Sequence, residues 1–240
     1  MDVTGITRPQ SQARVLSLDL DWAPPEVLAD CLGLLDQAGI RATIFLTDAP
    51  EHPAVDGHDI GLHPNAKPQS SLLQSFDLLA ARYPGARGVR SHGLETSGLF
   101  QAHCADKGIH YTSNYLHFLQ PDIRPLIMPF GLWELPIFFS DATALRFQET
   151  HGLWPTAAAL LQGDGLKVFC FHPVHVFINS FGFAHYAQAK ADYHDPARLR
   201  RHRRSGPGVR QLFQELVTVL GPGDHSFAPV MQALREDTVC

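Results

Sequence analysis

Residues 14–22 read RVLSLDLDW, a short apolar run that alternates with polar residues and ends in two carboxylates. This pattern predicts a buried strand that leads into a chemical site. Because side chains two apart on a strand point the same way, Asp19 and Asp21 are expected to project into one pocket. Adjacent carboxylates repel, so a divalent cation or a proton is expected to hold the pair. The alternative is that both carboxylates cap the following helix, whose first turn lies near Pro24 and Pro25.

Composition indicates a globular protein with a full core. Of the 240 residues, 45% are apolar and 18% are charged, a usual balance for one soluble domain of this length. The formal net charge of −5 provides no basic surface for nucleic acid, and no stretch is apolar enough for a membrane span. The sequence therefore predicts neither a nucleic-acid partner nor a membrane-spanning segment.

The amino-terminal residues and the cysteines indicate the domain organisation and the cellular location that we expect. Residues 1–13 are polar and lack the features of a signal peptide. We expect them to form a flexible segment ahead of a single domain at residues 14–240, in a cytoplasmic protein. The four cysteines are scattered without disulfide or metal spacing, so they are expected to be buried thiols.

Strand and helix patterns alternate along most of the chain. A helix is predicted at 25–38 and a strand at 41–47, which makes the opening a parallel strand–helix–strand unit. Further strands are predicted to end at His63 and to cover 88–93, 109–113 and 166–173; further helices are predicted at 70–81, 96–107, 152–162 and 209–220. The apolar segments 126–130 and 133–139 are broken by prolines and can be placed only as short strands or loops. Residues 179–207 are polar and irregular.

Side chains suited to catalysis follow several of the predicted strands. They are Asp19, Asp21, His63, Arg90, His92 and His172. In barrel-like α/β proteins the carboxyl ends of the strands meet at one mouth, where catalysis takes place. The sequence therefore predicts one site built from residues that are far apart in the chain.

Several motifs occur in the order typical of one family. The segments LDLDW (18–22), GIRATIF (39–45) and GHDIGLH (57–63) are followed by GVRSH (88–92) and FHP (171–173). Together they resemble the polysaccharide deacetylase family, the NodB-homology domain of carbohydrate esterase family 4 type, from about Val15 to Val176. The resemblance implies an α/β fold, a distorted (β/α) barrel in a single domain, and metal-dependent hydrolysis of an acetamido group on a sugar.

The resemblance also implies roles for individual residues. It assigns Asp21 to the metal and Asp19 to the general base, although these two roles could be exchanged. His63 matches the family's first metal histidine, and His172 matches the late histidine that would protonate the leaving amine. Arg90 would hold the base carboxylate by paired hydrogen bonds. The implied cofactor is one divalent ion, with zinc expected and cobalt or nickel as alternatives.

One position departs from the family pattern. The second metal histidine usually follows the first by four residues, and here that position is Lys67. His92, at another strand end beside Arg90, is the preferred replacement. His58 is the alternative, although its odd offset from His63 directs it to the opposite face of an extended strand. A third reading is that no second histidine binds, which leaves a weak or absent metal site.

Two other features have more than one reading. Trp22, Phe130 and Trp133 are expected to be core aromatics, with a sugar-binding platform as the alternative. The basic run Arg198–Arg204 is expected to be a solvated loop, with contact to a phosphate of a nucleotide-linked or lipid-linked sugar as the alternative.

The expected function is removal of an N-acetyl group from an amino sugar in a polysaccharide, a glycan or its biosynthetic precursor. An N-acetylated sugar or glycan is thus the expected partner, and a cytoplasmic location favours a precursor. One alternative is hydrolysis of another C–N amide bond on the same scaffold, because fold and metal do not fix the substrate. The other is a non-catalytic carbohydrate-binding domain that has lost the metal, which Lys67 would explain.

Overall fold

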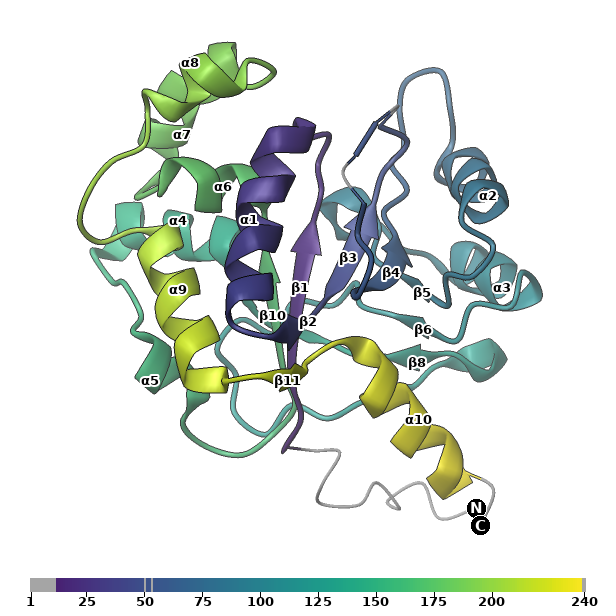
Figure 1. Ribbon diagram of the computed structural model, residues 1–240. Helices are drawn as coiled ribbons and strands as arrows, with labels where there is room; N and C mark the ends of the chain where they lie inside the picture. Colours follow the sequence, from purple (N-terminus) through teal and green to yellow (C-terminus); the bar gives the residue numbers. More distant parts are fainter. Residues whose placement is uncertain (1–11, 50, 53, 239–240) are drawn as a thin grey trace.

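The structure, a computed structural model, describes residues 12–49, 51–52 and 54–238. One nine-stranded sheet curls through the molecule in the order β7-β8-β6-β5-β4-β3-β1-β10-β9, and its helices pack outside (Figure 1). Neighbouring strands are parallel except β7 and β8, which are antiparallel. The strands are β1 (Arg14–Asp19), β3 (Thr43–Leu46), β4 (Asp59–Leu62), β5 (Gly88–Val89), β6 (Tyr111–Thr112), β7 (Leu126–Ile127), β8 (Trp133–Glu134), β9 (Ile137–Ser140) and β10 (Lys167–Phe171).

A proline-broken segment links the two sides of the curled sheet. β8 pairs with β6 and β9 pairs with β10, yet only Leu135 and Pro136 separate β8 from β9. In addition, the Ile137 amide donates to the Tyr115 carbonyl, and the His117 amide donates to the Ile137 carbonyl. The sheet thus forms a distorted barrel, and the predicted fold class is confirmed.

Helices of amphipathic sequence cover the outside of the sheet. α1 shows why: Val27, Leu28, Cys31, Leu32 and Leu35 recur at helical spacing and are all buried. The helices are α1 (Pro25–Gln37), α2 (Leu72–Arg82), α3 (Gly98–Asp106), α4 (Asp141–His151), α5 (Ala157–Leu161), α6 (Pro173–Ile178), α7 (Phe183–Ala189), α8 (Pro196–Arg200), α9 (Val209–Leu220) and α10 (Phe227–Thr238), with short 3₁₀ helices η2 (His92–Leu94), η3 (Pro129–Gly131) and η4 (Lys190–Asp192). Within the described ranges, no helix has the length and apolar character needed to cross a membrane.

The amino end of the barrel is closed by the last part of the chain. β11 (Gly223–Asp224) pairs with β2 (Ile40–Arg41) at this end, and α10 follows (Figure 1). The fully buried Phe227 ring stacks on Tyr111 at 4.7 Å between ring centres and meets Phe45 edge-on at 5.8 Å. α6, α7 and α8 lie at the opposite end of the barrel, at the carboxyl ends of the strands (Figure 1).

The predicted elements agree best with the structure where the pattern is strongly periodic. α9 has the predicted bounds, and α1 ends one residue earlier than predicted. The predicted helix at 152–162 is wrong in extent, because only α5 forms there. Neither α4 nor α10 was predicted, and the irregular region 179–207 contains α7, η4 and α8. The predicted flexible segment, residues 1–13, lies outside the described residues except for Gln12 and Ala13.

The basic run Arg198–Arg204 is not a solvated loop throughout, so that expectation is wrong for part of it. The Arg203 guanidinium lies 3.2 Å from Asp30 and 4.6 Å from the centre of the Phe177 ring. The Arg204 guanidinium lies 4.8 Å from the centre of the Phe181 ring. Arg203 and Arg204 thus contact aromatic rings in α6 or just after it, and the first three residues of the run belong to α8 rather than to a loop.

Candidate active site

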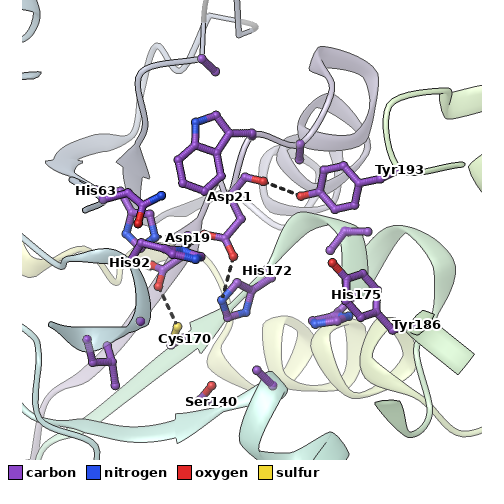
Figure 2. A pocket seen from close by; sticks show the side chains of 18 of the residues that line it. Asp19, Asp21, His63, His92, Ser140, Cys170, His172, His175, Tyr186 and Tyr193 are labelled. Carbon is purple, nitrogen blue, oxygen red and sulfur yellow. Dashed lines mark hydrogen bonds and ion pairs between the residues drawn. The ribbon is translucent and has the colours of Figure 1, made fainter. Parts of the chain in front are cut away.

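A cavity of about 1220 Å³ opens at the carboxyl ends of the strands (Figure 2). Five of the six predicted site residues line it: Asp19, Asp21, His63, His92 and His172. They come from four different strand ends, so parallel pairing brings them together as expected. The sixth, Arg90, is fully buried directly behind Asp19.

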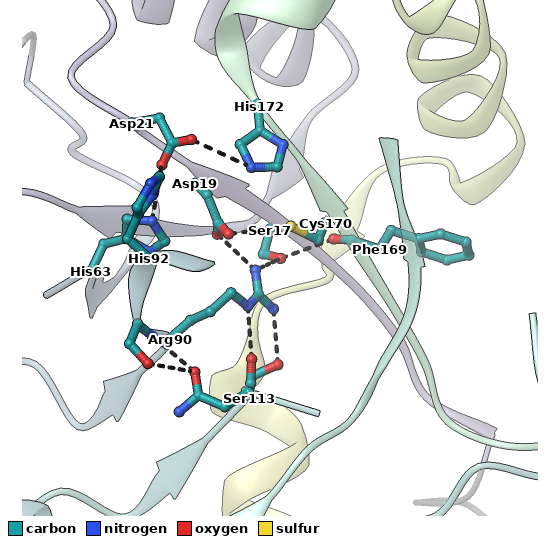
Figure 3. A network of polar contacts seen from close by, with 12 residues as sticks. Ser17, Asp19, Asp21, His63, Arg90, His92, Ser113, Phe169, Cys170 and His172 are labelled. Atoms are coloured by element: carbon teal, nitrogen blue, oxygen red, sulfur yellow. Dashed lines mark hydrogen bonds and ion pairs between the residues drawn. The ribbon is translucent and has the colours of Figure 1, made fainter. Parts of the chain in front are cut away.

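Asp19 is the last residue of β1 and is held at both carboxylate oxygens (Figure 3). Arg90 Nη1 donates to Oδ1 at 2.8 Å, and the Cys170 thiol donates to Oδ2 at 3.3 Å. The predicted paired hydrogen bonds from Arg90 to Asp19 are therefore wrong. The other donors of Arg90 go to Ser17 and Ser113, which lie on either side of it in the barrel interior.

Asp21 reaches the cavity through a turn, because β1 has already ended at Asp19. The backbone φ is 45° at Asp21 and 56° at Trp22, and the Ala23 amide donates to the Leu20 carbonyl at 2.9 Å. Positive φ at both central positions is the pattern of type I′ turns, which favour Gly, Asn and Asp. The expectation that both carboxylates enter one pocket is correct, but alternation along a strand is not the reason.

The helix-capping alternative for these carboxylates is also wrong. α1 begins directly after Pro24, and no side chain caps its first turn. Asp19 and Asp21 are directed into the cavity instead.

Two histidines converge on one oxygen of Asp21. Oδ1 lies 3.0 Å from His63 Nε2 and 3.0 Å from His92 Nδ1. One donor atom from each residue can be chosen so that all three lie within 4.8 Å of one another. His63 directly follows β4 and His92 begins η2 after β5, so neighbouring strands deliver both rings. The structure thus brings together the three residues proposed as metal ligands.

His58 lies elsewhere. It precedes β4 at the amino end of the barrel, where its Nδ1 accepts from the Ala42 amide and its Nε2 lies 3.5 Å from Asp36. It does not line the cavity. The alternative ligand set that contains His58 is therefore not supported by the geometry.

Lys67, at the position of the family's second histidine, reaches the rim of the cavity. Its Nζ lies 2.6 Å from Asp48 Oδ2, and the indole nitrogen of Trp22 donates to Asp48 Oδ1 at 2.6 Å. The Trp22 ring meets His92 edge-on at 5.2 Å. The lysine thus takes part in holding Trp22 beside the histidines.

Only one of the three aromatic residues considered from the sequence lines the cavity. That residue is Trp22. Trp133 packs against the main core, and Phe130 is 59% exposed. Trp22 also packs, partly buried, against the main core while it lines the cavity, so the expectation of core aromatics is wrong only for Phe130.

His172 follows β10 and stands at the first turn of α6. Its Nδ1 lies 2.6 Å from Asp141 Oδ1, and its amide donates to Asp141 Oδ2 at 2.8 Å. Its Nε2 is directed toward Asp21, at 3.6 Å from Oδ2. Sequence reasoning missed Asp141, although the apolar run 137–139 that precedes it is the same signal that identified Asp19.

The comparisons with known proteins agree with this architecture. A family model described as WbmS-like polysaccharide deacetylase matches residues 16–190, well over half of the chain. The chain belongs to the WbmS-like polysaccharide deacetylase family. The resemblance inferred from the motifs is thereby confirmed. No curated protein matches the chain.

Two solved structures are similar to this WbmS-like deacetylase domain. A candidate polysaccharide deacetylase involved in O-antigen biosynthesis, from Bordetella bronchiseptica, has a TM-score of 0.77 and 23% identity, covering 91% of this chain and 95% of its own. A candidate polysaccharide deacetylase from Mycobacterium smegmatis has a TM-score of 0.54 and 16% identity, covering 97% and 94%. At these identities the similarity concerns the fold.

The surroundings of Asp19 and Asp21 favour the ionised form of both carboxyl groups. Burial alone would raise the pKa of Asp19, but Arg90 and nearby histidines hold it below its usual value. Burial opposes ionisation of Asp21 as well, yet His172 and the bonds from His63 and His92 hold its pKa well below the usual range. Both carboxylates are therefore ionised at neutral pH.

His172 and Cys170 both keep a proton at neutral pH. Burial favours neutral His172, but Asp141 and then Asp21 outweigh burial and raise the pKa of His172 to about 10. Burial and then Asp19 raise the pKa of the Cys170 thiol well above its usual value. At neutral pH His172 is thus an imidazolium, and Cys170 is a thiol that donates to Asp19.

The donor set of this WbmS-like domain fits a divalent cation. Two imidazole nitrogens and one carboxylate oxygen form a common ligand set of catalytic zinc sites, which keep a further position open. The side chain of His63 is 2% exposed, whereas that of His92 is 39% exposed toward the cavity. The three residues Asp21, His63 and His92 therefore fit one ion that is reachable from the cavity.

Proposed function

We propose that this protein is a metal-dependent deacetylase that removes an N-acetyl group from an amino sugar of a glycan or its biosynthetic precursor. The observation that carries the proposal is the convergence of His63 and His92 on Asp21, beside Asp19 and His172 in one cavity. Asp21, His63 and His92 would hold one divalent ion, with zinc expected and cobalt or nickel as alternatives.

A divalent ion bound there would supply Lewis acidity, which polarises an acyl carbonyl and lowers the pKa of a water molecule. Asp19 is ionised and fixed at both oxygens, so it can accept the proton of the attacking water. His172, oriented by Asp141, can donate a proton through Nε2 to the departing nitrogen. The water oxygen first bonds to the acyl carbon as Asp19 takes a proton from the water. The C–N bond then breaks, its electron pair stays on the nitrogen, which takes the proton of His172, and acetate and a free amino sugar are released.

The size and lining of the cavity favour a substrate larger than one sugar ring. Its volume, about 1220 Å³, exceeds the range of about 300–1,000 Å³ usual for small-molecule sites. Trp22 and Tyr186 both line the cavity and supply aromatic surface to it. Given the O-antigen role attributed to the Bordetella protein, a building block of a surface polysaccharide is the proposed substrate class, and it suits a cytoplasmic enzyme.

Acetate release from a substrate panel tests the proposal. The panel holds free, nucleotide-linked and lipid-linked N-acetylamino sugars and short N-acetylated oligosaccharides, with protein loaded in turn with zinc, cobalt and nickel. We expect acetate from at least one member, no acetate after chelation, and recovery when metal is returned.

Two other outcomes would replace the proposal. Release of an amine from non-sugar amides without acetate from any panel member would favour hydrolysis of another C–N bond. Sugar binding that a chelator leaves unchanged, in a protein that takes up no metal, would favour a binding domain.

A further inference from the structure

A hydrogen bond joins the proposed metal ligand Asp21 to a distant part of the chain. The Tyr193 hydroxyl donates to the main-chain carbonyl of Asp21 at 2.5 Å, across 172 residues of sequence. Figure 2 shows this bond at the edge of the cavity, opposite the two histidines that contact the Asp21 carboxylate. The backbone and the side chain of Asp21 are thus held from two different directions.

Asp21 stands in a backbone conformation that needs such support. Asp21 and Trp22 both have positive φ, and a non-glycine residue held in this region persists only where its surroundings fix it. Aspartate enters the left-handed region more readily than a bulky residue such as tryptophan. A contact that fixes the Asp21–Trp22 peptide therefore bears directly on where the Asp21 carboxylate points.

Three contacts hold this turn, and they act on different groups. The Ala23 amide closes the turn on the Leu20 carbonyl, and Asp48 holds the Trp22 indole. The Tyr193 hydroxyl holds the Asp21–Trp22 peptide itself, because it bonds to the carbonyl of Asp21. This contact therefore constrains the backbone immediately next to the side chain that would bind metal.

Tyr193 is itself well anchored. It directly follows η4, and its amide donates to the Lys190 carbonyl. Next to it, Asp192 Oδ2 lies 2.8 Å from His202 Nε2, and Asp195 caps α8. The basic run thus contributes His202 to the support of the segment that carries Tyr193.

We propose that Tyr193 is a positioning residue for the metal site: it holds the Asp21 carbonyl and so aims the Asp21 carboxylate at the position shared by His63 and His92. This inference rests on the proposed function, because it requires Asp21 to be a metal ligand. Loss of the hydroxyl would leave the three donors in place but remove the constraint on one of them.

Metal affinity of the full chain carrying Tyr193→Phe tests the inference. The dissociation constants for cobalt and zinc are measured by chelator competition, together with the visible spectrum of bound cobalt. We expect affinity to fall by about 10–100-fold, the range seen when partners that orient a ligand are removed. The cobalt spectrum should also change, because the carboxylate is no longer fixed. Tyr186→Phe, on the same side of the cavity, is the matched control and should leave the affinity unchanged.

The outcomes separate this inference from the proposed function. If the native protein binds no metal, the proposed function fails and the inference fails with it. If the native protein binds metal and Tyr193→Phe binds it equally well with the same cobalt spectrum, only the inference fails. A fall in the denaturant midpoint of the metal-free variant large enough to account for the lost affinity would show a merely structural role and would also overturn it.

Discussion

The two sides of the cavity are built in different ways. The strand-end side, made of Asp19, Asp21, His63 and His92, carries charged and hydrogen-bonding groups that follow parallel strands. The helical wall, made of residues 173–194, presents Phe183, Tyr186 and Tyr193 and a neutral histidine, His175. His172 stands where the two sides meet. The strand-end side therefore supplies the reactive groups, whereas the helical wall shapes the cavity and supports them.

The largest expected effects come from neutralising each carboxylate of the strand-end side. Asp19→Asn should retain metal and lower kcat by about 10²–10⁴-fold, the usual contribution of a general base. Asp21→Asn should lose the metal as well as the activity. Metal analysis of the two purified variants, beside their kcat for acetate release, checks both expectations. The reverse pattern of metal retention would exchange the two roles.

The next largest effect concerns the buried support of Asp19. Arg90→Met should destabilise the fold by about 3–5 kcal/mol, because it leaves a buried carboxylate without its cationic partner. Arg41→Met is the matched control: its pair with Asp224 is exposed, so the expected loss is below about 1 kcal/mol. Denaturant unfolding measures both changes. Equal losses would show that the Asp19–Arg90 pair is not the support we infer.

The free energy of unfolding should depend on pH in the way expected for a neutral His175 in the helical wall. Burial lowers the pKa of His175 from 6.5 to about 4. Between these values the unfolded chain binds a proton that the folded protein does not, so stability is full above pH 6.5 and falls as pH decreases toward 4. The loss reaches about 3 kcal/mol. Unfolding of metal-free native protein and His175→Asn at pH 7 and pH 4 measures it, and the variant should lack this part of the decrease.

A similar pH dependence in both proteins would contradict that assignment. His175 is a suitable probe because its Nδ1 lies 3.0 Å from the Ser180 hydroxyl, and asparagine can place a polar atom at the same position. The comparison is made without metal so that loss of metal at low pH does not contribute.

The smallest expected effect concerns Lys67. Restoring the family's histidine with Lys67→His should leave metal content at one ion per chain, because His92 already occupies the place beside Asp21. Loss of the exposed pair with Asp48 should change stability by less than about 1 kcal/mol. Elemental mass spectrometry and thermal unfolding check the two values. A second bound ion would show that the two histidine positions are independent.

The two sides also differ in how far the sequence predicts them. The strand-end side follows from short apolar runs with polar residues at their ends, so Asp19, His63 and His172 could be placed before the structure was known. Asp21 was placed correctly for the wrong reason, because turn geometry at a non-glycine residue leaves little trace in sequence.

The helical wall could not be predicted in the same way. α6 and α7 are short, and Tyr193 is positioned by contacts with residues as distant as Asp21. Asp141, which lies outside this wall at the start of α4, was missed because the strand before it follows a proline break, which hides its direction. Tertiary contacts rather than local periodicity determine this part of the site.

The most direct test of the account is the metal content of the purified protein, measured by elemental mass spectrometry for the native chain, His92→Ala and His58→Ala. We predict about one divalent ion per chain in the native protein and in His58→Ala, and none in His92→Ala, because His92, unlike His58, lies beside Asp21 and His63. Absence of metal from the native protein after incubation with zinc, cobalt or nickel, or full retention in His92→Ala, would contradict the account.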